Sequence, residues 1–172
     1  DIIKGNASEI RALTGDGKVE AVGVDVAEKD RITADDDTRL EDMGEAVKQL
    51  AIRYGCVVLA TGEVDLVSDG REVYGLRNGT ERLASITGTG CILTCLTACY
   101  LSQVKPLYAA MLATSVLNIS AQLAEKGLAS VRGDNSDNYV GIGQGRFKTA
   151  LFDQLSLITS KELEELVDYK EI

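Results

Sequence analysis

The sequence has no histidine, no tryptophan and only two phenylalanines among its 172 residues. Without histidine the chain cannot use a Ser-His-Asp or Cys-His nucleophile, an HExxH zinc hydrolase site or a Cys/His zinc finger. A general base, if the chain has one, must therefore be Asp, Glu, Lys, Tyr or Cys. The scarcity of Trp and Phe also removes most of the side chains on which nucleic-acid bases stack.

Basic residues are outnumbered by acidic ones, with 18 Lys+Arg against 27 Asp+Glu and a net charge of −9. The acidic residues are spread along the chain rather than gathered in a tail. Because affinity for a phosphate backbone rests on clustered Lys and Arg, we expect no nucleic-acid partner.

The four cysteines are Cys56, Cys91, Cys95 and Cys99, and the last three lie four residues apart in an apolar stretch typical of a helix. This spacing does not suit a disulfide framework, and a reduced, cytoplasmic compartment is expected. Cys95 and Cys99 are expected in the core, with a soft-metal site as the alternative. No apolar run reaches 18 residues and no signal-peptide pattern is present, so we expect neither membrane spanning nor secretion.

Strand and helix signals alternate in the first half of the chain, and helical signals dominate the second. We expect strands over residues 2–4, 56–60, 64–67, 72–76 and 83–86, and helices over 6–15, 40–54, 91–103, 106–126, 146–157 and 160–169. The continuous apolar run 56–60 is typical of a strand buried on both faces. The pattern predicts an α/β layered fold with helices packed on a mostly parallel sheet.

The sequence also predicts the segments that connect these helices and strands. Asp69-Gly70 predicts a hairpin, residues 19–37 an acidic surface excursion, and residues 133–145 a polar, glycine-rich loop. The chain opens on what looks like the end of a buried strand, so we expect a sequence entered in mid-domain.

The segment Thr87-Gly88-Thr89-Gly90-Cys91 stands at a predicted strand-to-helix junction. Its glycines let the backbone approach a ligand, and the first N–H groups of the helix point toward that ligand with the positive end of the helix dipole. The segment therefore suits an anion hole for a phosphoryl group, with the Cys91 thiol beside it. The alternative is a tight turn followed by a small core cysteine.

Two further segments follow predicted strands, where ligands of open α/β sheets lie. In Gly5-Asn6-Ala7-Ser8-Glu9, Glu9 is either the partner of an Asn6 N-cap or a ligand of a hydrated metal ion. In Thr61-Gly62-Glu63-Val64-Asp65, Thr61 offers a hydroxyl to a phosphate or belongs to an ordinary turn. Gly141-x-Gly143-x-Gly145 fits neither a dinucleotide-binding fingerprint nor a P-loop, because Arg146 and Phe147 stand where glycine is needed.

The order and spacing of these segments resemble the hydroxyethylthiazole kinase family of the ribokinase-like superfamily. The matching stretches are Ile3–Ile10, Ala60–Asp65 and Thr87–Cys91, with weaker similarity over 120–124, 143–147 and 153–155. The resemblance implies a ribokinase-like αβα fold, with residues 1–172 as a single kinase domain. It also implies transfer of the γ-phosphoryl group of ATP, with Mg²⁺, to the primary hydroxyl of 5-(2-hydroxyethyl)-4-methylthiazole.

Residue roles follow from the same resemblance. Cys91 would take the proton of the hydroxyl, and Gly88, Thr89 and Gly90 would form the anion hole, with Gly88 also near the thiazole alcohol. The nucleotide would be contacted by Lys4, Asn6 and Thr61, and Mg²⁺ with its waters would be held by Glu9. Lys4 replaces the arginine usual in the family, which keeps the charge but loses bidentate geometry.

The resemblance also implies that the N-terminal third of the family domain is absent from this sequence. That part supplies most thiazole contacts, in a site between subunits of a homotrimer, so this chain alone should not form the complete pocket. Two alternatives are a hydroxymethylpyrimidine (phosphate) kinase of the same superfamily and a non-catalytic nucleotide-binding fragment. Thr87 and Gly5 disfavour the pyrimidine branch, which tends to have His and Pro at these places.

Overall fold

A computed structural model of the chain describes residues 1–15, 36–132 and 143–172. One five-stranded sheet has the strand order β1-β2-β3-β4-β5. The strands are β1 Ile2–Asn6, β2 Val57–Thr61, β3 Asp65–Ser68, β4 Val73–Leu76 and β5 Tyr169–Glu171. Strands β1 and β2 pair in parallel, whereas β2–β3, β3–β4 and β4–β5 are antiparallel. The α/β class is thus confirmed, but a mostly parallel sheet is not what the described strands form, because the β3–β4 hairpin and the returning C-terminus supply antiparallel pairs.

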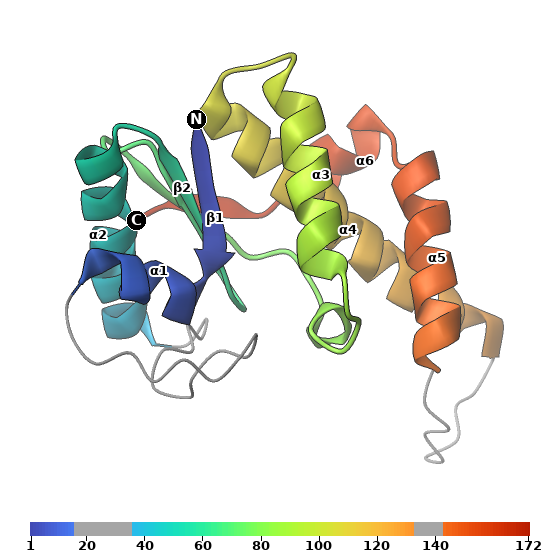
Figure 1. Cartoon of the computed structure of the whole chain (residues 1–172). Coiled ribbons are helices and arrows are strands. Elements are labelled where there is room, and N and C mark those ends of the chain that lie inside the picture. Colours follow the sequence, from blue (N-terminus) through green and yellow to red (C-terminus); the bar gives the residue numbers. More distant parts are fainter. Residues whose placement is uncertain (16–35, 133–142) are drawn as a thin grey trace.

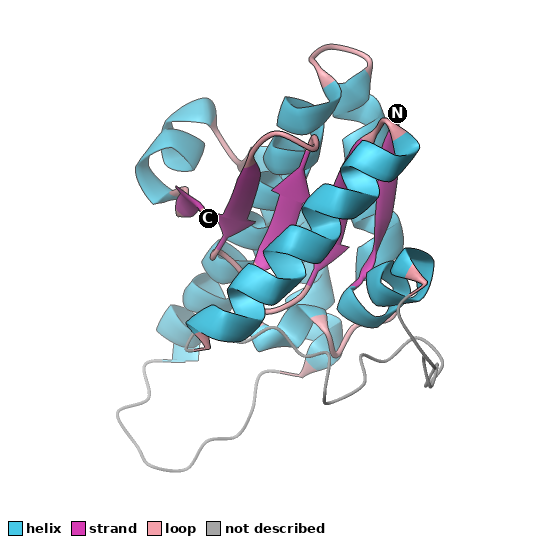
Figure 2. Cartoon of the chain, turned by 90° about the vertical axis from the view of Figure 1, so that its left-hand side faces the viewer, coloured by secondary structure: helices cyan, strands magenta, loops and turns pink. Residues whose placement is uncertain are grey.

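The helices cover both faces of this sheet. They are α1 Ala7–Thr14, α2 Asp37–Tyr54, the short 3-10 helix η2 Glu81–Leu83, α3 Thr89–Leu101, α4 Pro106–Arg132, α5 Gln144–Leu157 and α6 Ser160–Leu166. Helices α1 and α2 lie on one face, and α3, α4 and α5 lie on the other (Figure 1). Figure 2 views the sheet from the α1–α2 side, with the helices lying across the strands. The layered arrangement predicted from the sequence is confirmed.

Strand β2 shows why the sheet needs helices on both sides. Its side chains alternate, so that Val58 and Ala60 join the core under α1 and α2, while Val57 and Leu59 join the core under α3, α4 and α5. All four are buried. The continuous apolar run therefore marks a strand with two hydrophobic faces, as predicted.

Local signals set the ends of several elements. Helix α2 ends at Gly55, whose φ of 61° is left-handed and therefore favours glycine. Strands β3 and β4 form the predicted hairpin, and Asp69 Oδ1 accepts a hydrogen bond from the Arg71 N–H at 2.9 Å within its turn. The excursion predicted over 19–37 and the loop predicted over 133–145 fall almost wholly outside the described residues.

The C-terminus differs from the helix predicted over 160–169. Helix α6 stops at Leu166, and Tyr169–Glu171 pair with β4 as an edge strand. The following Ile172 packs on Gly75, where an added Cβ would lie 2.8 Å from the isoleucine Cδ1. The helix is confirmed over Ser160–Leu166, but its predicted end was wrong, because the tail gains backbone bonds and apolar contacts from a strand almost 100 residues earlier in the chain.

Helix α4 is the central element of the helical layer. By length and composition Pro106–Ala129 could cross a membrane, but 67% of its apolar window is buried inside the protein. Its buried residues include several small ones, such as Ala110, Ala113 and Ala121, which let α3 and α5 pack closely on it. Its apolar character is therefore accounted for by the core.

Candidate active site

Strands β1 and β2 end side by side at one edge of the sheet. The parallel register places Asn6 opposite Thr61, and the Thr61 hydroxyl donates to the carbonyl of Gly5 at 3.4 Å. Lys4 lies two residues earlier on β1. The three residues that the resemblance assigns to the nucleotide are therefore brought together. The sequence alone placed Lys4 and Asn6 at one strand end and Thr61 at another, without showing that the two ends are neighbours.

Asn6 and Glu9 form the predicted capping box at the start of α1. The Glu9 N–H donates to Asn6 Oδ1 at 2.9 Å, and the Asn6 N–H donates to Glu9 Oε2 at 2.7 Å. The Glu9 side chain crosses Gly5 so closely that a Cβ at position 5 would lie 3.0 Å from the Glu9 Cβ. The capping role is confirmed, and one carboxylate oxygen of Glu9 is engaged in it.

The segment before α3 is a series of tight turns, so the strand predicted over 83–86 is wrong. Backbone N–H groups from Leu83 to Ile86 donate to carbonyls three residues earlier, which leaves them no part in a sheet ladder. The Arg82 Nε lies 2.6 Å from Glu125 Oε1 on α4, and the Thr80 hydroxyl donates to the other carboxylate oxygen. These two bonds fix the segment to the helical layer and lower the pKa of Glu125.

The predicted anion hole lies at the N-terminus of α3, directly after a left-handed glycine. Gly88 has φ 102° and precedes the helix, which begins at Thr89 rather than at Cys91. The Thr89 hydroxyl donates to the carbonyls of Leu83 and Ile86, at 3.1 and 3.2 Å, and so fastens the turn. The Thr89 N–H donates to the Ile86 carbonyl at 3.5 Å, and no side chain caps this end of α3 in the part of the chain that the structure describes. Helix N-termini leave their first N–H groups without partners inside the helix, so the N–H groups after Thr89 remain available to a ligand.

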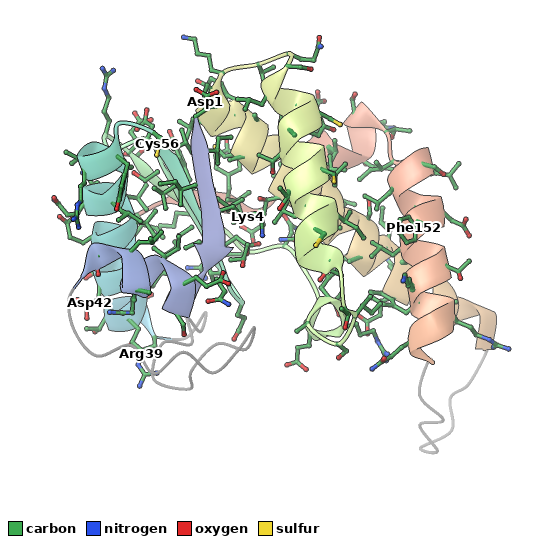
Figure 3. All side chains as sticks on the ribbon, in the orientation of Figure 1. Asp1, Lys4, Arg39, Asp42, Cys56 and Phe152 are labelled. Atoms are coloured by element: carbon green, nitrogen blue, oxygen red, sulfur yellow. The ribbon has the colours of Figure 1, made fainter. Side chains whose placement is uncertain are left out.

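Lys4 joins the two parts of the site. Its side chain extends from β1 toward α3 (Figure 3), and its Nζ lies 3.6 Å from the position that a Cβ would take on Gly90. An ammonium group and the positive end of a helix dipole thus face the same space. The Lys4 ammonium and the N-terminus of α3 together are suited to bind a phosphate group.

The cysteine stripe on α3 is not in the core. Cys91, Cys95 and Cys99 are all exposed, whereas Leu93 and Thr97 are the buried residues of this helix. The core prediction for Cys95 and Cys99 was wrong because α3 is apolar around its whole circumference and the described elements cover one side of it. Within the described residues no group of three His, Cys, Asp or Glu side chains could hold a metal ion, so the soft-metal alternative has no support.

The structure adds two residues to which the sequence gave no role, Asp65 and Asn118. Asp65 Oδ2 accepts from Asn118 Nδ2 at 2.7 Å, and its Oδ1 accepts from the Gly62 N–H at 3.0 Å. Burial raises the pKa of Asp65 to about 6, although the bonds from Gly62 and Asn118 and the charge of Lys4 act in the opposite direction. A carboxylate at the start of an apolar strand was the available sequence signal.

Comparison with known proteins identifies the family of this chain. The hydroxyethylthiazole kinase family model matches residues 1–161. The chain is 41% identical to Hydroxyethylthiazole kinase 2 of Clostridium botulinum over 144 residues, which are 83% of this chain and 53% of that protein. It is 34% identical to Hydroxyethylthiazole kinase 2 of Methanosphaera stadtmanae over 160 residues, 90% of this chain and 52% of that protein.

A solved structure of hydroxyethylthiazole kinase protein from Pyrococcus horikoshii OT3 superposes with a TM-score of 0.76 at 27% sequence identity. The alignment covers 100% of this chain and 55% of that one. The chain thus spans about half the length of the relatives it matches. The family match runs through all three segments of the candidate site, and the chain therefore belongs to the hydroxyethylthiazole kinase family.

Proposed function

We propose that this chain carries the phosphate-binding and catalytic part of a kinase that transfers the γ-phosphoryl group of ATP to the primary hydroxyl of 5-(2-hydroxyethyl)-4-methylthiazole. The observation that carries the proposal is the Lys4 ammonium beside Gly90 at the uncapped N-terminus of α3, in a chain that belongs to this family. The relatives' names favour the thiazole alcohol over a pyrimidine alcohol as the acceptor.

In this proposal the chain's residues divide the work of phosphoryl transfer. Lys4 and the N–H groups of Gly88 and Gly90 stabilise the charge on the phosphoryl oxygens, and Thr89 holds the turn of this anion hole through its bonds to Leu83 and Ile86. Cys91, exposed in the first turn of α3, takes the proton of the alcohol as its oxygen bonds to the γ-phosphorus and the bond to ADP breaks. Asn6 and Thr61, at the adjoining strand ends, contact the nucleotide.

Mg²⁺ fits this site as a companion of the nucleotide. The ion is usually held by one or two carboxylates together with phosphate oxygens and waters, rather than by a complete set of protein ligands. Glu9 supplies one carboxylate beside the end of β1, with Oε2 already accepting from the Asn6 N–H. We assign Glu9 to the ion's waters, and the ion would neutralise phosphate charge.

The thiazole pocket needs polypeptide beyond the residues described. Within them β1 pairs with β2 alone, so the other edge of β1 is open to a further strand. The relatives are longer than the stretch matched, with 53% of one and 55% of another covered. We propose that the missing contacts come from such additional polypeptide and from neighbouring subunits of a homotrimer, in a cytoplasmic enzyme without a nucleic-acid or membrane partner.

Phosphorylation assays on two proteins, the 172-residue chain and the whole protein in which this sequence is encoded, test the proposal. Each is given ATP, Mg²⁺ and either the thiazole alcohol or hydroxymethylpyrimidine. We expect the whole protein to phosphorylate the thiazole alcohol preferentially and the chain alone to be much slower. Preference for the pyrimidine alcohol would support a hydroxymethylpyrimidine kinase instead. If neither alcohol were phosphorylated, the alternative of a non-catalytic nucleotide-binding fragment would be supported.

A further inference from the structure

The side chains of Asp65 and Asn118 have no role in the proposed reaction, yet they join the two layers that carry its residues. Asp65 begins β3, and Asn118 lies near the middle of α4. Both side chains are buried, and the bond between them is 2.7 Å long. One directional hydrogen bond therefore crosses from the sheet to the helical layer.

On the sheet side, the same carboxylate fixes the turn after β2. Its Oδ1 accepts from the Gly62 N–H at 3.0 Å, and Gly62 directly follows Thr61. The position of Thr61 opposite Asn6 depends on where this turn leaves the sheet. Because one carboxylate holds both the turn and α4, a shift between the layers would be transmitted to Thr61.

On the helical side, Asn118 is held by the chain that follows β4. Its Nδ2 also donates to the carbonyl of Asn78 at 2.9 Å, and a Cβ on Gly79 would lie 3.6 Å from its Cγ. The Asn78 side chain in turn donates to Gln122 Oε1 and accepts from the Asp168 N–H. The Asn118 amide therefore cannot turn to follow Asp65 without breaking further bonds.

We propose that the buried Asp65–Asn118 pair is a positioning element that keeps the sheet half of the active site, Lys4 and Thr61, in register with the helical half, Gly88–Cys91. The inference rests on the proposed function, since it concerns the alignment of that reaction. Helix α3 packs on α4 through a shared core, so fixing α4 also fixes the N-terminus of α3. An apolar pair would join the layers without the directional bonds that select one position.

The magnitude of the effect follows from the geometry of transfer. A displacement of about 1 Å between reacting groups can lower the rate about 10²-fold. Burial raises the pKa of Asp65 to about 6, so the ionised carboxylate disfavours folding at neutral pH and is poorly explained as a stabilising residue alone. The pair should therefore affect kcat more than KM.

The test uses Asp65→Asn and Asn118→Ala in the whole encoded protein. We expect each variant to lower kcat about 10²-fold while the KM for the alcohol stays within about threefold of wild type. The double variant should lose little more than the worse single variant, because the two residues act as one unit. If Asp65→Asn does not fold, kcat and KM of Asn118→Ala decide the test.

Two matched variants separate positioning from loss of stability. Asp69→Asn changes another aspartate that holds a turn, at the far end of β3, and should keep kcat. Leu117→Ala opens a cavity beside Asn118 in the same helix, and should lower the melting temperature while keeping kcat at temperatures where the protein is folded. Near-ultraviolet circular dichroism confirms folding in every case.

Wild-type kcat in both folded single variants would overturn the inference, as would an equal loss of kcat in Leu117→Ala. Both outcomes leave the proposed function intact, because they require an active wild-type enzyme. A wild-type protein that transfers no phosphoryl group to the alcohol would instead overturn the proposed function, and the inference with it.

Discussion

The two glycines on either side of Thr89 are required for different reasons, and alanine at each position separates them. Gly88 has φ 102° and ψ −4°, and a Cβ there would meet nothing within 4 Å. The penalty in Gly88→Ala is therefore one of backbone conformation, about 1–3 kcal/mol for an L residue forced to positive φ. For a domain of this size, each kcal/mol lowers Tm by about 2–4 °C.

Gly90→Ala should show the opposite behaviour. Gly90 lies within α3, where alanine is the better helix former by about 1 kcal/mol, so stability should not fall. Its new methyl group would lie 3.6 Å from the Lys4 Nζ, in the space where we place the phosphate. Losing hydrogen bonds to a charged group costs about 1.5–3 kcal/mol, so we expect kcat/KM for ATP to fall about 10- to 100-fold.

Urea unfolding followed by circular dichroism measures the first effect, and steady-state kinetics with varied ATP measures the second. Gly127→Ala is the matched control, because Gly127 also lies in a helix with nothing within 4 Å of an added Cβ. It should unfold at the wild-type urea concentration or above, with unchanged kinetics. A wild-type unfolding midpoint in Gly88→Ala would refute the claim that position 88 requires glycine for its positive φ. Wild-type kcat/KM in Gly90→Ala would refute the placement of the phosphate between Lys4 and Gly90.

Three other predictions concern titratable groups. Cys91→Ala should lower kcat far more than it raises KM, whereas Cys91→Asp should retain activity because Asp also serves as a base; wild-type turnover in the alanine variant would eliminate the base role. Glu9→Gln should raise the Mg²⁺ concentration needed for half-maximal rate. An unchanged Mg²⁺ titration would show that Glu9 only caps helix α1. Burial raises the pKa of Asp65 from 3.8 to about 6, so the folded protein binds more protons between these pH values. Asp65 therefore contributes about 3 kcal/mol of stability that is present below pH 3.8 and lost as pH rises through 6. Urea unfolding of wild type and Asp65→Asn across this pH range measures the difference between their free energies of unfolding. That difference must vary with pH if the prediction holds.

Features that depend on neighbouring residues were predictable from the sequence. The capping box of Asn6 and Glu9, the Asp69-Gly70 hairpin and the end of α2 at Gly55 each involve residues within four positions of one another. Backbone conformation and local hydrogen bonds decide such features, and both follow from residue type. The apolar run of β2 likewise predicted a strand buried on both faces.

Two errors show where local patterns stop being informative. Residues 83–86 look apolar enough for a strand, but Thr80 and Arg82 bond to Glu125 on α4 and hold that segment in tight turns. Cys95 and Cys99 look like core residues, but exposure depends on which elements pack against α3. Apolar composition indicates that a helix can be buried and does not tell which of its faces is covered.

The order of the three site segments, their places at strand and helix ends, and the family can all be read from the amino-acid sequence. That the Lys4 ammonium lies beside Gly90 and that Asp65 bonds to Asn118 depends on how the layers pack. These partners are far apart along the chain, and they meet because both faces of one sheet are packed by helices. Hydrophobic burial brings the layers together without direction, whereas buried polar bonds fix their register. That register is a property of the packed layers, which no local pattern contains.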